Sequence, residues 1–261
     1  MNKIVRHCLA FFIIWLVCMS YSLPGIPENS LQKHSQKNIE LIIRFKAVVN
    51  GEPFIAKKNY TNAFNEPFSI DKFRFYFCKV RLTDAGTHIE IPVKKDDYFL
   101  IDFADSSSCT IKLTIGPGKY SNLVFLLGVD SMRNVSGAQT GALDPAKGMF
   151  WTWNSGYVMA KLEGSSSLSN QPAHAIAYHI GGFREPYNTA RIINLPFPQG
   201  KVLEVNDQGT HELYITADIN SWFNGPYPIH IKEKPTCTTP GILAKNISEN
   251  YSHMFTVQII N

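Results

Sequence analysis

The chain has 261 residues, of which 44% are hydrophobic, enough to bury a core in one large domain or two small ones. Charged residues make up 18%, and the formal charge of +4 includes Lys3 and Arg6 at the extreme N-terminus. Nucleic acid is excluded as an expected partner, because its binding needs a clustered basic stripe that this sequence lacks.

The N-terminus has the pattern of a targeting segment. A short positive region is followed by the apolar run "CLAFFIIWLVCM" at 8–19, which is too short to cross a bilayer comfortably. Ser20 and Ser22 then supply small residues at a cleavage site. Residues 1–22 are therefore predicted to be a secretory signal peptide. The mature chain is expected to be secreted, periplasmic or on the cell surface, without a transmembrane span.

A lipid anchor at Cys18 is the alternative, but "WLVC" lacks the small residues that normally precede a lipidated cysteine. The next segment, 23–38, is polar and rich in turn-forming residues, which predicts a flexible linker. If the leader is removed, three cysteines remain, so at most one disulfide can form; they are Cys78, Cys109 and Cys237.

From residue 39 onward the pattern is that of short strands. Apolar residues alternate with polar ones over 39–47, and Asn50-Gly51 follows as a hairpin turn. Further strands, separated by turns rich in Gly, Pro and Asp, are expected within 71–92, 98–103, 109–129, 201–205, 211–219 and 255–260. One helix is expected near the C-terminus, with Thr239 as its cap and Pro240 at its first position.

This succession predicts an all-β fold, an antiparallel β-sandwich or barrel-like domain with one short C-terminal helix, spanning 39–261. The sequence contains no nucleophile elbow, Walker loop, zinc-protease motif or EF-hand spacing. The chain is accordingly expected not to be an enzyme.

The stretch "GMFWTWNSGYVMAKLEG" at 148–164 is unusually aromatic. In an extended strand, Met149, Trp151 and Trp153 would project to one face. Core packing is the common explanation for such rings. The functional alternatives are a surface for stacking a ligand and an electron-rich site beside a metal.

A second stretch, "HAIAYHIGGF" at 174–183, places His179 on a strand face shared with small residues. A single histidine is usually a hydrogen-bonded structural residue. Imidazole nevertheless suits copper, and thioether sulfur suits Cu(I). The two stretches together suggest a cluster of four residues, Met149, Trp151, Trp153 and His179.

These stretches carry a resemblance to a known family. The matching segments are "FKAVVNGEPF", "FRFYFCKVRL", "YFLIDF", "LVFLLGVDSMRN", "GALDPAKGMFWTWNSGYVMAKLEG", "YHIGGF" and "NYSHMF", in that order along the chain. With them the chain resembles the MbnP-like family of secreted copper-binding proteins, over nearly all of the predicted mature sequence.

The resemblance implies a function. In better understood members of the family, copper is held by histidine and by a kynurenine made from tryptophan. These proteins are often encoded with a di-haem enzyme of the MbnH type, related to cytochrome c peroxidases, which performs the oxidation. The resemblance implies Trp151 or Trp153 as the oxidised residue and His179 as a copper ligand. Copper-binding members tend to have a histidine after the asparagine of the "GV…N" segment, whereas here Asn134 is followed by Val135. Further ligands could come from His88, His174, His211 or Met149.

The first hypothesis is therefore a secreted, β-rich protein of this family type that binds copper or serves as the substrate of a partner di-haem oxidase. The alternative is a metal-free surface binding module, in which the tryptophan pair is a platform for a glycan or a protein partner.

Overall fold

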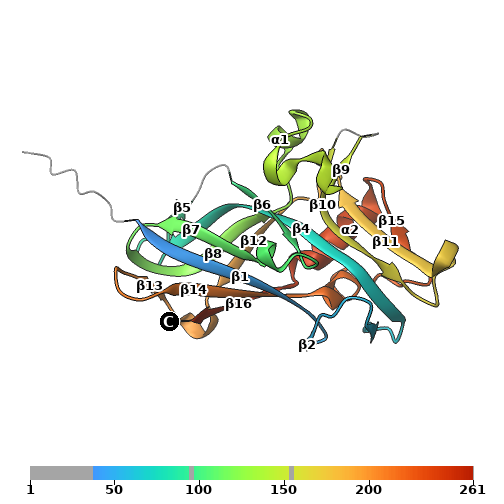
Figure 1. Ribbon diagram of the computed structural model, residues 1–261, viewed down its shortest axis with the longest axis horizontal. Coiled ribbons are helices and arrows are strands. Elements are labelled where there is room, and N and C mark those ends of the chain that lie inside the picture. Colours follow the sequence, from blue (N-terminus) through green and yellow to red (C-terminus); the bar gives the residue numbers. More distant parts are fainter. Residues whose placement is uncertain (1–37, 94–96, 153–155, 261) are drawn as a thin grey trace, which may run out of the picture. The chain divides into compact units, whose positions relative to one another are not determined.

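The computed structural model describes residues 38–93, 97–152 and 156–260. By its internal contacts the chain divides into two units, residues 1–35 and 36–261. The predicted signal peptide and nearly all of the predicted linker lie outside the described residues. The second unit contains every strand and helix given below (Figure 1).

The smaller sheet has five strands and is built round β1 (Ile39–Val49). On one side β1 runs parallel to β14 (His211–Asp218), which pairs in turn with β16 (Phe255–Ile260). On the other side β1 pairs antiparallel with β7 (Thr110–Ile115) and with the short β2 (Glu52–Pro53). The β1–β2 turn is the predicted Asn50-Gly51, and both residues have the positive φ that such a turn requires.

The larger sheet is built round β4 (Pro67–Asp84), which pairs antiparallel with β8 (Gly118–Leu127) and β10 (Gly156–Ser165). Beyond these lie β12 (Arg191–Pro196), beside β8, and β11 (Ala175–Gly181), beside β10. Shorter strands extend it: β3 (Asn59–Thr61), β5 (Glu90–Pro92), β6 (Tyr98–Asp102), β9 (Phe150–Trp151), β13 (Leu203–Val205) and β15 (Thr236–Cys237).

The longest described helix is α2 (Ile242–Ser252), near the predicted position. The predicted start was wrong, because the helix is preceded by Gly241 and neither Thr239 nor Pro240 belongs to it. Pro240 instead packs beside the end of β11, where a Cβ at Gly182 would lie 3.3 Å from the Pro240 ring. The other helical segments are α1 (Ser131–Val135) and the 3-10 turns η1 (Ser106–Cys109), η2 (Gly141–Leu143), η3 (Pro145–Lys147), η4 (Pro172–His174), η5 (Pro198–Gly200) and η6 (Ile219–Trp222).

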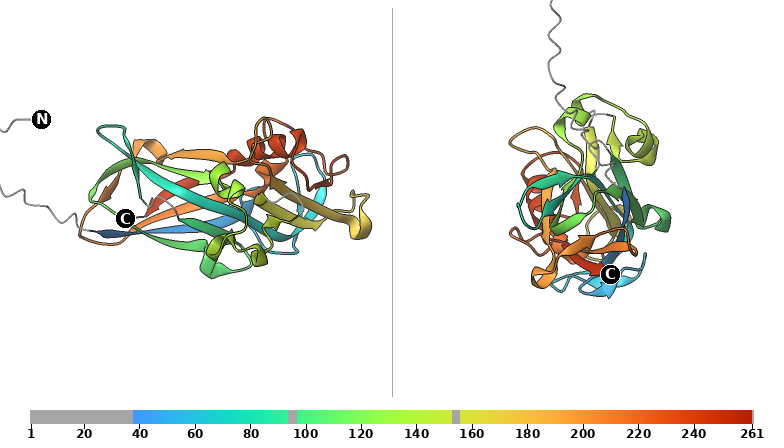
Figure 2. Two further views of the ribbon diagram at one scale, coloured as in Figure 1. Left: turned by 90° about the horizontal axis from the view of Figure 1, so that it is seen from above. Right: turned by 90° about the vertical axis from the view of Figure 1, so that its left-hand side faces the viewer.

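The predicted all-β class is confirmed: the two sheets curl into a half-barrel with one short C-terminal helix. The pairing is mainly antiparallel, with β1–β14 and β11–β15 as parallel exceptions. Figure 2 shows the strands of both sheets arranged round a common interior. In the described part of the chain, no helix has the length and apolar character needed to cross a membrane.

The large sheet is covered on both faces, which creates two cores. Its inner face contributes Phe75 and Phe77 to the main core, where their rings lie 5.7 and 5.1 Å from that of Phe45 on the other sheet. Its outer face, beneath α1 and the segment after that helix, carries a second core; its buried members are Tyr76, Val129, Leu143, Met149, Trp151, Tyr157, Val158 and Met159. Because successive side chains of a strand point to opposite faces of the sheet, the neighbours Phe75 and Tyr76 on β4 lie in different cores.

Candidate functional site

The aromatic stretch 148–164 forms a hairpin, and the prediction of one continuous strand was wrong. β9 pairs antiparallel with the start of β10, so that Trp151 stands opposite Gly156 and Phe150 opposite Tyr157. Trp153 lies outside the described residues.

Trp151 is buried in the second core, with 7% of its surface exposed. Its indole rests on the backbone of β11 at Gly181, because a Cβ added there would lie only 2.5 Å from Cζ3 of the ring. Any side chain at residue 181 would displace the indole. Met149, one residue before β9, is fully buried in the same core.

His179 lies on the same strand, two residues before Gly181, so it projects to the same face of the sheet as the Trp151 indole. Its Nε2 is 2.8 Å from Oε1 of Glu163 on β10. The other carboxylate oxygen of Glu163 is 2.9 Å from Nζ of Lys72 on β4. The imidazole therefore contacts Glu163, which in turn forms an ion pair with Lys72, and the three side chains come from three neighbouring strands.

A row of charged groups crosses the sheet at the level of His179. The strand register places Arg74, Lys161 and His179 side by side on β4, β10 and β11, with Asp102 beyond Arg74 on β6. Arg74 pairs with Asp102 at 2.9 Å, and Lys161 donates to the carbonyl of Gly148 at 2.5 Å. Gly148, the first residue of the hairpin that carries Trp151, thus joins the hairpin to this row through its hydrogen bond with Lys161.

The row and its neighbours hold more positive than negative charge. Lys72, Arg74 and Lys161 surround two carboxylates, those of Glu163 and Asp102. The hydrogen bond from His179 and the nearby lysines lower the pKa of Glu163 to about 2, although burial opposes this. Burial and the neighbouring cations lower the pKa of Lys161, with only partial compensation from Glu163. An added cation at this place would meet repulsion.

The other predicted ligands lie elsewhere. His174 is in the turn before β11, and its Nδ1 is 3.1 Å from the carbonyl of Ser169. His211 is buried on β14 of the smaller sheet, with Nε2 2.9 Å from the carbonyl of Asn206. His88 is in the exposed turn after β4. Of the predicted residues with described positions, only Met149, Trp151 and His179 come from one neighbourhood.

In their unmodified form, the described residues do not assemble the ligands of a copper site. Among the residues with described positions, no three His, Cys, Asp or Glu side chains converge in a way that could hold a metal. The cysteines 78, 109 and 237 are free thiols, and burial raises the pKa of the Cys237 thiol to about 11. Val135, at the position where copper-binding members tend to have histidine, is 66% exposed on α1.

Asn134, by contrast, is almost fully buried and joins α1 to the hairpin. Its side-chain amide donates to the carbonyl of Val129 at 2.8 Å, and its carbonyl oxygen accepts from the backbone N–H of Tyr157 at 2.8 Å. Asp130 caps the helix by accepting from the N–H groups of Met132 and Arg133. The asparagine thus has a structural role independent of metal.

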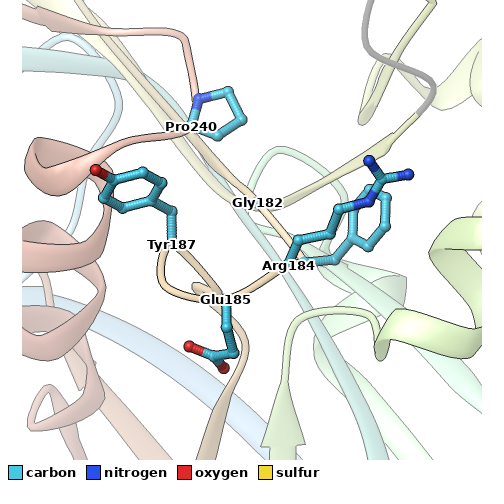
Figure 3. A pocket seen from close by; sticks show the side chains of 6 residues that line it. Gly182, Arg184, Glu185, Tyr187 and Pro240 are labelled. Atoms are coloured by element: carbon cyan, nitrogen blue, oxygen red, sulfur yellow. The ribbon is translucent and has the colours of Figure 1, made fainter.

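Two features of this region were missed from the sequence. One is the set of tyrosines in the second core, whose members are far apart in the chain. The other is a cavity of about 190 Å³ at the end of β11 (Figure 3), lined by Gly182, Phe183, Arg184, Glu185, Tyr187 and Pro240. The guanidinium of Arg184 lies over the Phe183 ring at 5.1 Å, and Tyr187 is 43% exposed.

The fold and this aromatic hairpin define a class, that of β-rich domains with a buried tryptophan next to a strand-borne histidine. A sequence model of the MbnP family matches residues 38–239, and the chain therefore belongs to that family. Among solved structures it is similar to MbnP from Methylosinus trichosporium, with a TM-score of 0.57 and 13% identity, covering 86% of this chain and 100% of that one. At that identity the likeness shows the fold. A search of curated proteins gave no match.

The ion pairs of Glu163 generate a pH-dependent stability. Because its pKa is about 2 in the folded protein and 4.5 for the free side chain, we expect the folded state to gain stability from the ionised carboxylate above pH 4.5. That gain, about 1–3 kcal/mol, is lost as the pH falls from 4.5 to 2. Urea unfolding at a series of pH values measures it.

Glu163→Gln should remove this part of the pH dependence. Glu204→Gln is the matched control, because Glu204 also pairs with a lysine but is 59% exposed and contributes little. Equal pH profiles for wild type and Glu163→Gln would contradict the assignment.

Proposed function

We propose that this MbnP-family protein is exported, that a partner di-haem oxidase of the MbnH type oxidises a tryptophan of its aromatic hairpin, and that copper binding depends on that oxidation. The protein itself is proposed not to be an enzyme. The single observation that supports this proposal is the position of the Trp151 indole against Gly181, two residues from His179 on the same strand face.

Oxidation of the tryptophan supplies metal-binding donor atoms that the described residues lack in their unmodified form. Cleaving the C2–C3 bond of the indole adds two oxygen atoms, which can come from two waters with the loss of four electrons and four protons to the oxidant. One further water releases the formyl group as formate and leaves kynurenine. Its ketone and aromatic amine are new donor atoms beside His179, where the described side chains offer one imidazole.

A tryptic peptide isolates the predicted target. Lys147 and Lys161 bound the segment 148–161, which contains both candidate tryptophans. After co-expression with the di-haem partner, we expect this peptide to carry the kynurenine mass change, with fragmentation separating it from oxidation of Met149 or Met159. Trp151→Phe and Trp153→Phe identify the oxidised ring. An unmodified peptide after co-expression with an active partner would refute the proposal.

Copper binding should depend on the modification. We expect the oxidised protein to take up more copper than the unmodified protein, as measured by equilibrium dialysis and elemental analysis. His179→Ala should weaken uptake by the oxidised protein, because it removes the imidazole nearest to the new donors. His174→Ala is the matched control, a histidine outside the hairpin region. Equal uptake by modified and unmodified protein would contradict the proposed dependence.

The second candidate function is a metal-free binding module for a glycan or a protein. The platform predicted for it included Trp151, whose 7% exposure leaves little ring face for a ligand. The cavity beside β11 offers the exposed ring of Tyr187 instead, next to Arg184 and Glu185. Among the described residues, the side chains of Arg184 and Glu185 form no hydrogen bond or ion pair.

This function predicts that Tyr187→Ala abolishes binding to an oligosaccharide array, whereas Tyr227→Ala, a ring of similar exposure elsewhere, leaves it unchanged. Absence of binding by the wild-type protein would reject a glycan-binding function.

A further inference from the structure

The second core differs in chemistry from the main core. Of its eight buried members, five are Tyr, Trp or Met, whereas in the described main core only seven of 47 are Tyr, Trp, Met or Cys. These are the side chains from which an electron is most easily removed. Phe, Leu, Ile and Val, which fill the main core, do not exchange electrons under biological conditions. The hairpin tryptophan is thus embedded among oxidisable groups.

The tyrosines of this region form a series that leads away from Trp151. Tyr157 follows Gly156 on the hairpin, and its backbone carbonyl and the Trp151 indole both lie within 3 Å of the point where a Cβ of Gly181 would be. The ring of Tyr157 lies 6.0 Å from that of Tyr76, centroid to centroid, in an edge-to-face arrangement. The backbone of Tyr157 therefore adjoins the indole, and the rings of Tyr157 and Tyr76 belong to the same core as Trp151.

The series reaches the surface at Tyr98. In the β4–β6 register Tyr98 stands opposite Cys78, so it is a diagonal neighbour of Tyr76 on the same face. Tyr98 is only partly buried and packs against the second core. Figure 1 shows β6, which carries it, beside β4 and below α1.

The hydroxyl of Tyr98 has a built-in proton acceptor. It donates to Oδ2 of Asp130, and the same oxygen is 3.1 Å from Nζ of Lys79. These hydrogen bonds, with that from the backbone of Arg133, lower the pKa of Asp130 despite the opposing effect of burial, so the carboxylate is ionised. A tyrosine that loses an electron becomes a strong acid, and a carboxylate already in contact with it can take the proton.

We propose that Tyr98, Tyr76 and Tyr157 form an electron relay between Trp151 and the protein surface. The relay rests on the proposed function, since the oxidant is the haem group of the partner enzyme. In each transfer the oxidant takes one electron from Tyr98, whose proton moves to Asp130. An electron then passes from Trp151 through Tyr157 and Tyr76 to Tyr98, which recovers its proton. Four such transfers supply the four electrons that the two-oxygen conversion of the indole releases.

A light-driven oxidant tests the relay without the partner. Photoexcited ruthenium tris-bipyridine with persulfate removes single electrons from groups at the surface. The full chain is used in a Trp153→Phe background, and oxidation of Trp151 is measured on the tryptic peptide. We expect Tyr98→Phe and Tyr157→Phe to lower the initial rate of Trp151 oxidation several-fold, because Phe keeps the ring but cannot carry the charge.

Two variants serve as controls. Tyr178→Phe removes an equally buried phenol from the main core, where it donates to the carbonyl of Lys234 at 2.7 Å, and should leave the rate unchanged. Tyr98→Trp restores an oxidisable ring and should recover part of the rate. Thermal unfolding midpoints confirm that every variant is folded at the assay temperature.

Unchanged Trp151 oxidation in folded Tyr98→Phe and Tyr157→Phe would overturn the relay, as would an equal loss in Tyr178→Phe. The same variants are then compared with the di-haem partner. If the partner fails to oxidise the wild-type protein while the light-driven rates depend on the tyrosines, the proposed function fails and the relay stands. If the partner oxidises all variants equally, the function stands and the relay fails.

Discussion

The contact between the Trp151 indole and the backbone of Gly181 is the constraint on which the rest of the hairpin region depends. A flat ring of this size can lie directly on a strand only where that strand has no side chain. Its position there puts the indole on the face of β11 that carries His179, and in one core with Met149 and Tyr157.

The charged row beside this contact makes the surroundings of His179 unfavourable for a cation. The His179 imidazole is paired with Glu163, whose charge is shared with Lys72, while Arg74 and Lys161 adjoin it. A cation entering this place has to displace an ion pair and approach a positive neighbourhood. New neutral donors, such as the ketone and amine of kynurenine, would compensate for part of that cost.

Local patterns were sufficient for much of the fold. Alternation over 39–47, the Asn50-Gly51 turn and the faces of β11 were all predictable from period two and turn chemistry. The hairpin within 148–164 was missed because aromatic residues suit an extended strand throughout. The helix was predicted to start too early, at Pro240. This proline instead packs beside Gly182, a contact that sequence spacing does not reveal.

The candidate site was harder to predict for a physical reason. Neighbourhood on a sheet is set by strand order, and β4, β6, β10 and β11 bring Tyr76, Tyr98, Lys161 and His179 together from distant parts of the chain. Residue type drew attention to Trp151 and His179, which the strands bring into one neighbourhood, yet gave no indication of Glu163 or the tyrosines. Asn134 illustrates the same limit. Its buried side-chain amide joins α1 to β10 through hydrogen bonds that sequence spacing does not reveal, and these bonds place no requirement on the exposed residue Val135 that follows it.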